Sequence, residues 1–173
     1  MADAPRAAWE AVLATLVAER GDALARYAYV LCGDRDEAAD LVQSALVATF
    51  GRVRNGFEID RAEAYVRRAI ASAHIDRGRK ASRWRSTAHL HLAEQSIESP
   101  SARVDQRIDL RAELGSLSPR ERACVVLRYY GDHKVDDIAA DLGISAGAVK
   151  RYLSDGLAKL ARALTEPARE HHV

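Results

Sequence analysis

The chain has 173 residues, of which 48% are hydrophobic and 29% charged, and its formal net charge at pH 7 is +1. That length suits one ordinary domain or two small ones, and the near-neutral charge argues against binding nucleic acid through bulk positive charge alone. Cys32 and Cys124 lie in apolar helical patterns, which favours reduced core residues over a disulfide framework. No stretch predicts a signal peptide or a membrane span, so we expect a cytoplasmic protein.

Charge is distributed unevenly along the chain. Residues 1–60 contain six basic and ten acidic residues, a net charge of −4, whereas residues 61–85 contain eight basic and two acidic residues, a net charge of +6. An acidic surface beside a basic stretch suggests two different partners.

Helical periodicity predicts four helices in the first half, at 6–19, 21–32, about 36–53 and about 61–80. Gly21 separates the first two, and Asp34 is placed to cap the third. No window alternates β-branched residues in the manner of a strand, so the predicted fold class is all-α.

The fourth predicted helix has a polar and basic outer face. Its residues that fall off the apolar stripe are Arg67, Arg68, Ala71, Ser72, His74, Arg79 and Lys80. Arg83, Trp84 and Arg85 extend the basic run, and Trp84 could stack on a nucleic-acid base. An equally weighted alternative is a solvated basic helix end with Trp84 packed locally.

The middle of the chain is predicted to be a linker. Residues 86–105 lose helical periodicity and gain serine, histidine and proline, which predicts a flexible tether between two small helical domains at 1–85 and 106–165, with a tail at 166–173. His89 and His91 lack a cysteine or acidic cluster beside them, so solvated linker histidines are favoured over metal ligands. No metal or other cofactor is expected.

The second half contains a predicted helix-turn-helix. A helix at 106–116 precedes Ser118-Pro119-Arg120-Glu121, a capping box with proline in the first helical turn. A later helix is stopped by Gly143, and Ser145 is placed to cap the helix that follows. Apolar residues at helical spacing predict one small core, formed by Ile138, Leu142, Ile144, Val149, Leu153, Leu157 and Leu160.

The outer face of that last helix is short, polar and basic. It carries Ser145, Gly147, Lys150, Arg151 and Ser154, without a large hydrophobic residue. A helix in the DNA major groove needs donors for guanine edges and phosphates and small residues where its backbone comes close. We therefore favour DNA binding over an ordinary helical hairpin with a solvated face.

The whole chain resembles a sigma factor of the extracytoplasmic-function (ECF) group. Residues 27–34 and 37–43 resemble region 2 of that family, and Ala64 to Arg68 with Ile75 to Arg77 resemble its promoter-reading helix. Leu117 to Arg122 and Ile138 to Leu153 resemble region 4. Departures at Ser72, Lys134 and Ala148 bear on promoter preference.

The resemblance implies three binding surfaces. The chain would bind core RNA polymerase at its clamp and flap, and the residues that bind it would include Asp40, Leu41, Gln43 and Ser44. The −10 element would be held by Arg52, Arg54, Asn55, Phe57, Arg67, Arg68, Ala71, Ser72, Arg79 and Lys80. The −35 element would be read by Ser145, Ala146, Gly147, Lys150, Arg151 and Ser154. Members of the family are often held inactive by an anti-sigma factor, which is the further partner implied.

Two other functional classes fit the sequence less well. A two-domain regulator with a LuxR-type helix-turn-helix shares the second-half pattern, but its first half should alternate strands with helices. An enzyme is disfavoured because the sequence has no glycine-rich phosphate loop, HExxH or CxxC metal spacing, or glycine-flanked nucleophile, and we expect no catalytic residues.

Overall fold

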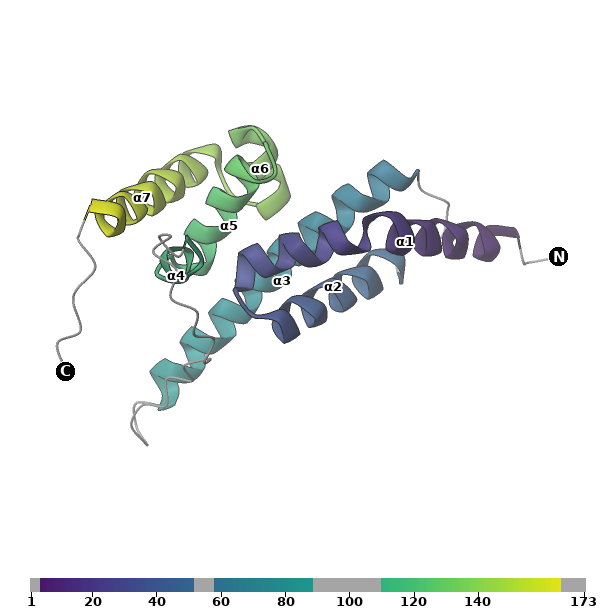
Figure 1. Ribbon diagram of the computed structural model, residues 1–173, viewed down its shortest axis with the longest axis horizontal. Helices are drawn as coiled ribbons and strands as arrows, with labels where there is room; N and C mark the ends of the chain where they lie inside the picture. The colour runs from purple at the N-terminus through teal and green to yellow at the C-terminus, as the bar shows by residue number, and fades with distance from the viewer. Residues whose placement is uncertain (1–3, 52–57, 89–109, 166–173) are drawn as a thin grey trace.

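The structure is a computed structural model that describes residues 4–51, 58–88 and 110–165, and every regular element in those ranges is an α-helix (Figure 1). The first bundle contains α1 (Ala4–Cys32), α2 (Arg35–Phe50) and α3 (Ile59–Ala88). The second contains α4 (Leu110–Gly115), α5 (Pro119–Tyr129), α6 (Val135–Leu142) and α7 (Ala146–Thr165). The predicted all-α fold class is confirmed.

The first bundle is built on a single long α1. The predicted break near Gly21 is wrong, because α1 is continuous from Ala4 to Cys32. A glycine inside a helix costs only about 1 kcal/mol relative to alanine. Leu16 and Leu24, on either side of it, are both fully buried, so packing of one continuous apolar stripe offsets that cost.

The third helix is longer than predicted. It was expected to end at about Lys80, yet α3 runs to Ala88, and its later half projects beyond the bundle (Figure 1). No proline interrupts 59–88, and arginine, lysine and alanine are good helix formers. Residues 86–88, predicted as the start of the linker, are therefore helical, and the rest of 86–105 lies outside the described residues, as does the tail at 166–173.

Local signals set the helix ends of the second bundle as predicted. The Glu121 amide donates to Ser118 Oγ at 3.3 Å and the Ser118 amide donates to Glu121 Oε2 at 2.9 Å, which completes the capping box. Gly143 ends α6 with φ 62°, a left-handed backbone that glycine adopts without steric cost. The Ala148 amide donates to Ser145 Oγ at 3.1 Å at the start of α7. These bonds confirm the predicted turn.

The predicted core of the second bundle is mostly confirmed. Ile138 and Val149 are fully buried, and Leu153 is 9% exposed. Leu157 is instead 39% exposed, because it lies at the edge of an apolar groove between helices. Within the described residues, no helix combines the length and apolar character that crossing a bilayer requires.

The two bundles pack against each other. Helices α5 and α6 lie on α1 and α3 (Figure 1), and we call this contact the seam. Tyr130 stacks on Tyr27 across it, with ring centroids 6.3 Å apart and an interplanar angle of 28°. The seam brings together residues that are about a hundred positions apart in the chain, which no local sequence pattern reveals.

Candidate nucleic-acid interfaces

Helix α7 has one buried and one exposed face. Val149, Leu153 and Gly156 are buried against the rest of the second bundle. A Cβ at Gly156 would stand 3.1 Å from Val125 Cγ2, so this glycine lets α7 approach α5 closely. The opposite face is open to solvent over a full turn.

The residues predicted to read the −35 element lie on that open face. Ser145, Gly147, Lys150, Arg151 and Ser154 are exposed, and Ala146 is half-buried. Their placement in one strip on the second helix of a helix-turn-helix is the geometry with which such motifs enter a major groove. The orientation predicted from the sequence for this helix is confirmed, whereas its contacts with DNA stay a prediction.

Tyr152 supports this strip, a role that its place in the sequence does not indicate. Arg120 Nη1 donates to the Tyr152 hydroxyl at 3.0 Å, and the Arg151 guanidinium lies over the Tyr152 ring, 5.3 Å from its centroid. The hydrogen bond from Arg120 lowers the pKa of Tyr152 below its ordinary value of 10.0. Two arginines from α5 and α7 thus converge on one ring beside the proposed DNA face, which pre-orients positive charge for a phosphate.

An ion pair between the nearly buried Glu121 and the partly exposed Lys159 joins α7 to α5. Lys159 Nζ donates to both Glu121 carboxylate oxygens, at 2.9 and 2.8 Å. Burial alone would raise the pKa of Glu121, but the hydrogen bonds from Lys159 and from the Ser118 backbone outweigh it and lower the pKa. The pair therefore sets the position from which α7 presents its outer strip.

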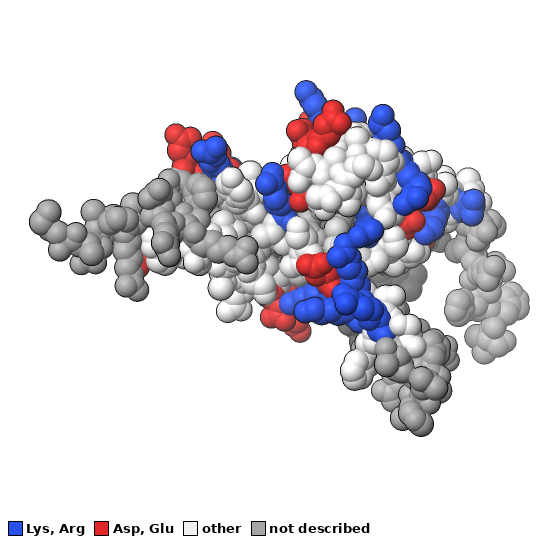
Figure 2. Space-filling model, turned by 180° about the vertical axis from the view of Figure 1, so that it is seen from behind, with Lys and Arg blue, Asp and Glu red and all other residues white. Residues whose placement is uncertain are grey.

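Basic side chains gather along α3. Figure 2 shows Lys and Arg side chains collected over its projecting half, where Arg79, Lys80 and Arg83 are exposed. Trp84 is 77% exposed, so the alternative of a locally packed tryptophan is wrong. An exposed indole beside arginines and a lysine offers a stacking surface within a positive field, as proteins that bind single-stranded nucleic acid use.

Two residues predicted on the outer face of α3 are buried instead. Ala71 is 0% exposed and His74 is 7% exposed, while Ser72 is half-buried. The reason is that α3 packs against α1 and α2 on one side and against the second bundle on another, so its apolar and small residues face protein on more than one side. Ala71 therefore cannot touch DNA in this arrangement.

Arg67 and Arg68 are already engaged with protein groups. Arg67 Nη2 lies 2.8 Å from Glu63 Oε1, and its guanidinium lies over the Tyr27 ring, 5.1 Å from the centroid. Arg68 Nε donates to Asp141 Oδ1 of α6 at 2.8 Å. The remaining −10 predictions, Arg52, Arg54, Asn55 and Phe57, lie outside the described residues.

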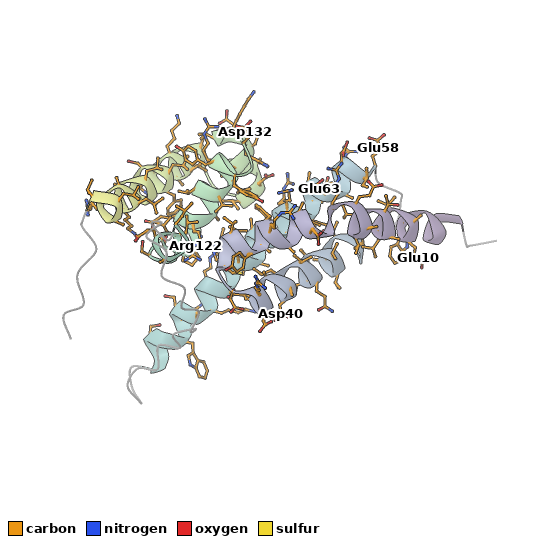
Figure 3. All side chains as sticks on the ribbon, in the orientation of Figure 1. Glu10, Asp40, Glu58, Glu63, Arg122 and Asp132 are labelled. Carbon is orange, nitrogen blue, oxygen red and sulfur yellow. The ribbon has the colours of Figure 1, made fainter. Side chains whose placement is uncertain are left out.

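The outer surface of α2 carries the residues predicted to bind polymerase, with one exception. Asp40, Gln43 and Ser44 are exposed, and Asp40 is labelled at the edge of α2 in Figure 3. Leu41 is 0% exposed and belongs to the core of the first bundle, so its assignment to a binding surface is wrong. The 3.6-residue period places Leu41 on the opposite side of the helix from Gln43.

An apolar groove lies where α1, α4, α5 and α7 meet. Its volume is about 540 Å³, and it is lined only by aliphatic side chains and two tyrosines, namely Val30, Leu110, Leu114, Val125, Val126, Tyr129, Tyr130, Leu157 and Leu160. Leu110 and Tyr129 are 59% and 63% exposed. A contiguous exposed apolar surface of this kind marks a protein-binding site more often than chance would allow. In the part of the chain that the structure describes, no three histidine, cysteine or acidic side chains gather as a metal site would require.

Comparisons with known proteins agree with both bundles. Residues 16–84 match the family model described as sigma-70 region 2, and residues 107–160 match that described as sigma-70, region 4. The chain is 35% identical to the RNA polymerase sigma-E factor of Streptomyces avermitilis, over 89% of this chain and 91% of that protein. It is 31% identical to the ECF RNA polymerase sigma factor SigL of Mycobacterium tuberculosis, over 92% and 93%.

One solved structure shows the same fold. It is the sigma factor RpoE of Bartonella quintana in complex with the anti-sigma factor NepR, with a TM-score of 0.61, 22% sequence identity, and coverage of 86% of this chain and 93% of that one.

Proposed function

The chain belongs to the ECF group of the sigma-70 family of RNA polymerase sigma factors, and we propose that its two bundles hold two separate promoter elements while α2 binds core polymerase. Sigma factors are non-catalytic regulators, so the polymerase carries out RNA synthesis. The alternative of a LuxR-type regulator is not favoured, because 16–84 match region 2 and every regular element that the structure describes within them is an α-helix.

The single observation that carries the proposal is the two-faced α7. Its buried face is fixed by Val149, Leu153 and the pair between Glu121 and Lys159, so its outer strip is held rigidly. Lys150 and Arg151 on that strip donate to base edges and phosphates of the −35 element. A good bidentate contact with guanine is worth about 1–3 kcal/mol of discrimination.

Helix α3 binds the −10 element. Arg79, Lys80 and Arg83 neutralise phosphates, and Trp84 stacks on an unpaired base. Opening the duplex needs no catalytic group, because binding to extruded bases and single-stranded backbone offsets the lost pairing and stacking. The proposed division of the chain is 1–85 for polymerase and the −10 element and 106–165 for the −35 element, with α3 carrying the first part to Ala88.

Asp40, Gln43 and Ser44 on α2 dock core polymerase at the clamp, and the acidic character of residues 1–60 suits a basic partner surface. The apolar groove takes an apolar helix of the polymerase flap. Its exposed Leu110, Tyr129 and Leu157 supply the anchors for such a helix. An anti-sigma factor, the partner of the structural relative, is a further proposed partner of this chain.

Two measurements test the proposal. Gln43→Ala should weaken association with purified core polymerase in a fluorescence-anisotropy titration, whereas Asp22→Ala, an exposed site on α1, should leave it unchanged. Lys150→Ala should weaken discrimination among −35 sequences in duplex selection by about ten-fold or more. If Gln43→Ala and Asp22→Ala bind polymerase with equal affinity, the surface of α2 is removed from the proposal. If Lys150→Ala leaves −35 discrimination unaltered, the strip on α7 is removed.

A further inference from the structure

Tyr152 lies between two arginines that come from different helices. Arg120 of α5 donates from Nη1 to the Tyr152 hydroxyl at 3.0 Å, and its guanidinium lies 5.9 Å from the ring centroid. The Arg151 guanidinium lies 5.3 Å from the same centroid. Side chains one position apart on a helix do not face each other, so Arg151 contacts the ring only by turning along the surface of α7. We call these three side chains the Tyr152 cluster.

The Tyr152 cluster contains two positive charges and no carboxylate. Among the residues that the structure describes, neither Arg120 nor Arg151 forms an ion pair, and the face of the ring and the hydroxyl oxygen are what they contact. Two cations that share one neutral ring repel each other, and an anion that binds between them relieves this repulsion. The cluster is therefore suited to a single anionic group.

The hydroxyl of Tyr152 also has a hydrogen to donate. A tyrosine hydroxyl both accepts and donates, and its oxygen already accepts from Arg120. In the part of the chain that the structure describes, this hydroxyl donates to no protein acceptor. The bond from Arg120 lowers the pKa of Tyr152, and a hydroxyl bonds more strongly to an anion than to a neutral acceptor. The cluster thus offers one neutral donor beside two cationic ones.

The cluster lies at the flank of the strip that the proposed function assigns to the −35 element. Arg151 belongs to that strip, and Tyr152 is half-buried on the side of α7 that meets the start of α5. When the second helix of a helix-turn-helix lies in a major groove, its outermost residues face base edges and its flanks face the sugar-phosphate walls. The anion within reach of the cluster is therefore a backbone phosphate.

We propose that Tyr152 binds a backbone phosphate of the −35 duplex through its hydroxyl, and that Arg120 and Arg151 donate to the same phosphate. Tyr152 is thus a ligand of the phosphate and also holds the two arginines around it. This inference rests on the proposed assignment of the α7 strip to the −35 element. Because a phosphate carries no sequence information, the hydroxyl contact strengthens binding to every −35 sequence alike.

Removing the hydroxyl alone is the first test. Tyr152→Phe keeps the ring that Arg151 contacts, and the probe is a fluorescein-labelled duplex that the wild-type chain, in complex with purified core polymerase, selects from a random pool. The complex of the variant should bind this duplex about two- to ten-fold more weakly, with the ratio of affinities for different −35 sequences unchanged. Tyr29→Phe makes the same change on α1 and is the matched control, which should bind as the wild type does.

Neutral phosphates in the probe show whether the lost contact is with the DNA backbone. A methylphosphonate replaces one charged phosphate oxygen with a methyl group, and a series of probes carries it at successive positions. At one position in or beside the −35 element it should weaken binding of the wild type, and Tyr152→Phe should cause no further loss there. On every other probe Tyr152→Phe should keep its effect. Such non-additivity indicates a direct contact, because a purely structural effect would be the same on all probes.

The same series of probes tests the two arginines. Arg120→Ala and Arg151→Ala should each lose their effect at the position where Tyr152→Phe does, because the three side chains share one phosphate. Arg162→Ala removes an equal charge from an exposed site of the same helix, and it should show no such dependence on position. Retained thermal unfolding transitions show that each variant is folded.

The outcomes separate the two proposals. If Tyr152→Phe binds as the wild type does, or loses affinity equally on every probe, its phosphate contact is overturned, while weaker −35 discrimination by Lys150→Ala still supports the assignment of α7. If the arginines lose their effect at a different position from Tyr152→Phe, the single-phosphate cluster is overturned. If the wild-type complex selects no −35 sequence, the assignment of α7 is overturned, and this inference with it.

Discussion

The pair between Glu121 and Lys159 gives a direct test of what holds α7 in place. Replacing Lys159 with methionine keeps the length and apolar stem of the side chain but removes the ammonium that donates to both Glu121 oxygens at 2.9 and 2.8 Å. The Glu121 carboxylate would then keep only its bond from the Ser118 amide, at 2.9 Å, while remaining nearly buried.

The expected cost follows from the burial of the two partners. Removing one partner from a fully buried ion pair costs about 3–5 kcal/mol. Exposed pairs contribute only about 0.2–1 kcal/mol. The Glu121 side chain is 8% exposed and that of Lys159 is 45% exposed. An intermediate loss of about 1–3 kcal/mol in the free energy of unfolding is expected for Lys159→Met, because water reaches the ammonium and screens it.

Urea denaturation separates this effect from the rest of the molecule. Trp9 packs against the core of the first bundle, whereas Trp84 is 77% exposed on the projecting half of α3. Tryptophan fluorescence therefore reports the first bundle through Trp9, while far-ultraviolet circular dichroism reports both bundles. Lys159→Met should shift the circular-dichroism transition of the second bundle to lower urea and leave the fluorescence transition nearly unchanged. Lys150→Met, the same substitution at an exposed site of the same helix, should change stability by less than about 0.5 kcal/mol.

The dependence on pH has a defined sign. The pKa of Glu121 in the folded protein is below its ordinary value, so its contribution is complete above the unfolded pKa and is lost as pH falls through the folded one. Lys159→Met should reduce this loss in acid, and adding Glu121→Gln should recover part of the stability at neutral pH. A Lys159→Met protein as stable as Lys150→Met would refute this account of how α7 is positioned.

Three further predictions concern other parts of the molecule. Gly143→Ala should destabilise the second bundle by about 1–2 kcal/mol in urea denaturation, because a φ of 62° is unfavourable for alanine. The added methyl group itself meets no atom within 4 Å, so the backbone angle is the cause. Equal stability of the two proteins would contradict the left-handed turn. Burial lowers the pKa of His74 to about 4, from an ordinary 6.5. The unfolded chain therefore binds a proton at this residue at a higher pH than the folded protein does, so the free energy of unfolding should fall by at most about 3 kcal/mol as pH falls from 6.5 towards 4. His74→Leu should flatten that part of the curve of stability against pH. Leu41→Ala should cost about 2–5 kcal/mol of stability, while Gln43→Ala should cost almost none; the reverse order would put Leu41 back on the surface.

Most of the second bundle could be predicted from its sequence because its signals are local. Ser118, Gly143 and Ser145 each act on backbone groups within a few residues, and the structure contains all three contacts. The strip on α7 was predicted equally well, since the position of a residue around a helix follows from its spacing alone.

The errors in the first bundle have a common physical origin. The local preference of glycine predicts a helix end at Gly21, but the packing of α1 against two neighbours offsets that weak preference. A single apolar stripe predicts one buried face and so places Ala71 and His74 outward, whereas α3 is covered on more than one side. The seam could not be predicted, because Arg68 and Asp141 are brought together only by the packing of one bundle on the other.

The most direct test of the central claim is mapping of transcription start sites made by purified core RNA polymerase on a randomised promoter library, with and without this chain. We expect discrete starts that share one −10 and one −35 sequence, and an Arg151→Ala protein that keeps the −10 preference while the −35 preference weakens. The claim would be contradicted if transcripts started at the same places with and without the chain. It would also be contradicted if the chain bound a duplex operator tightly and never associated with core polymerase.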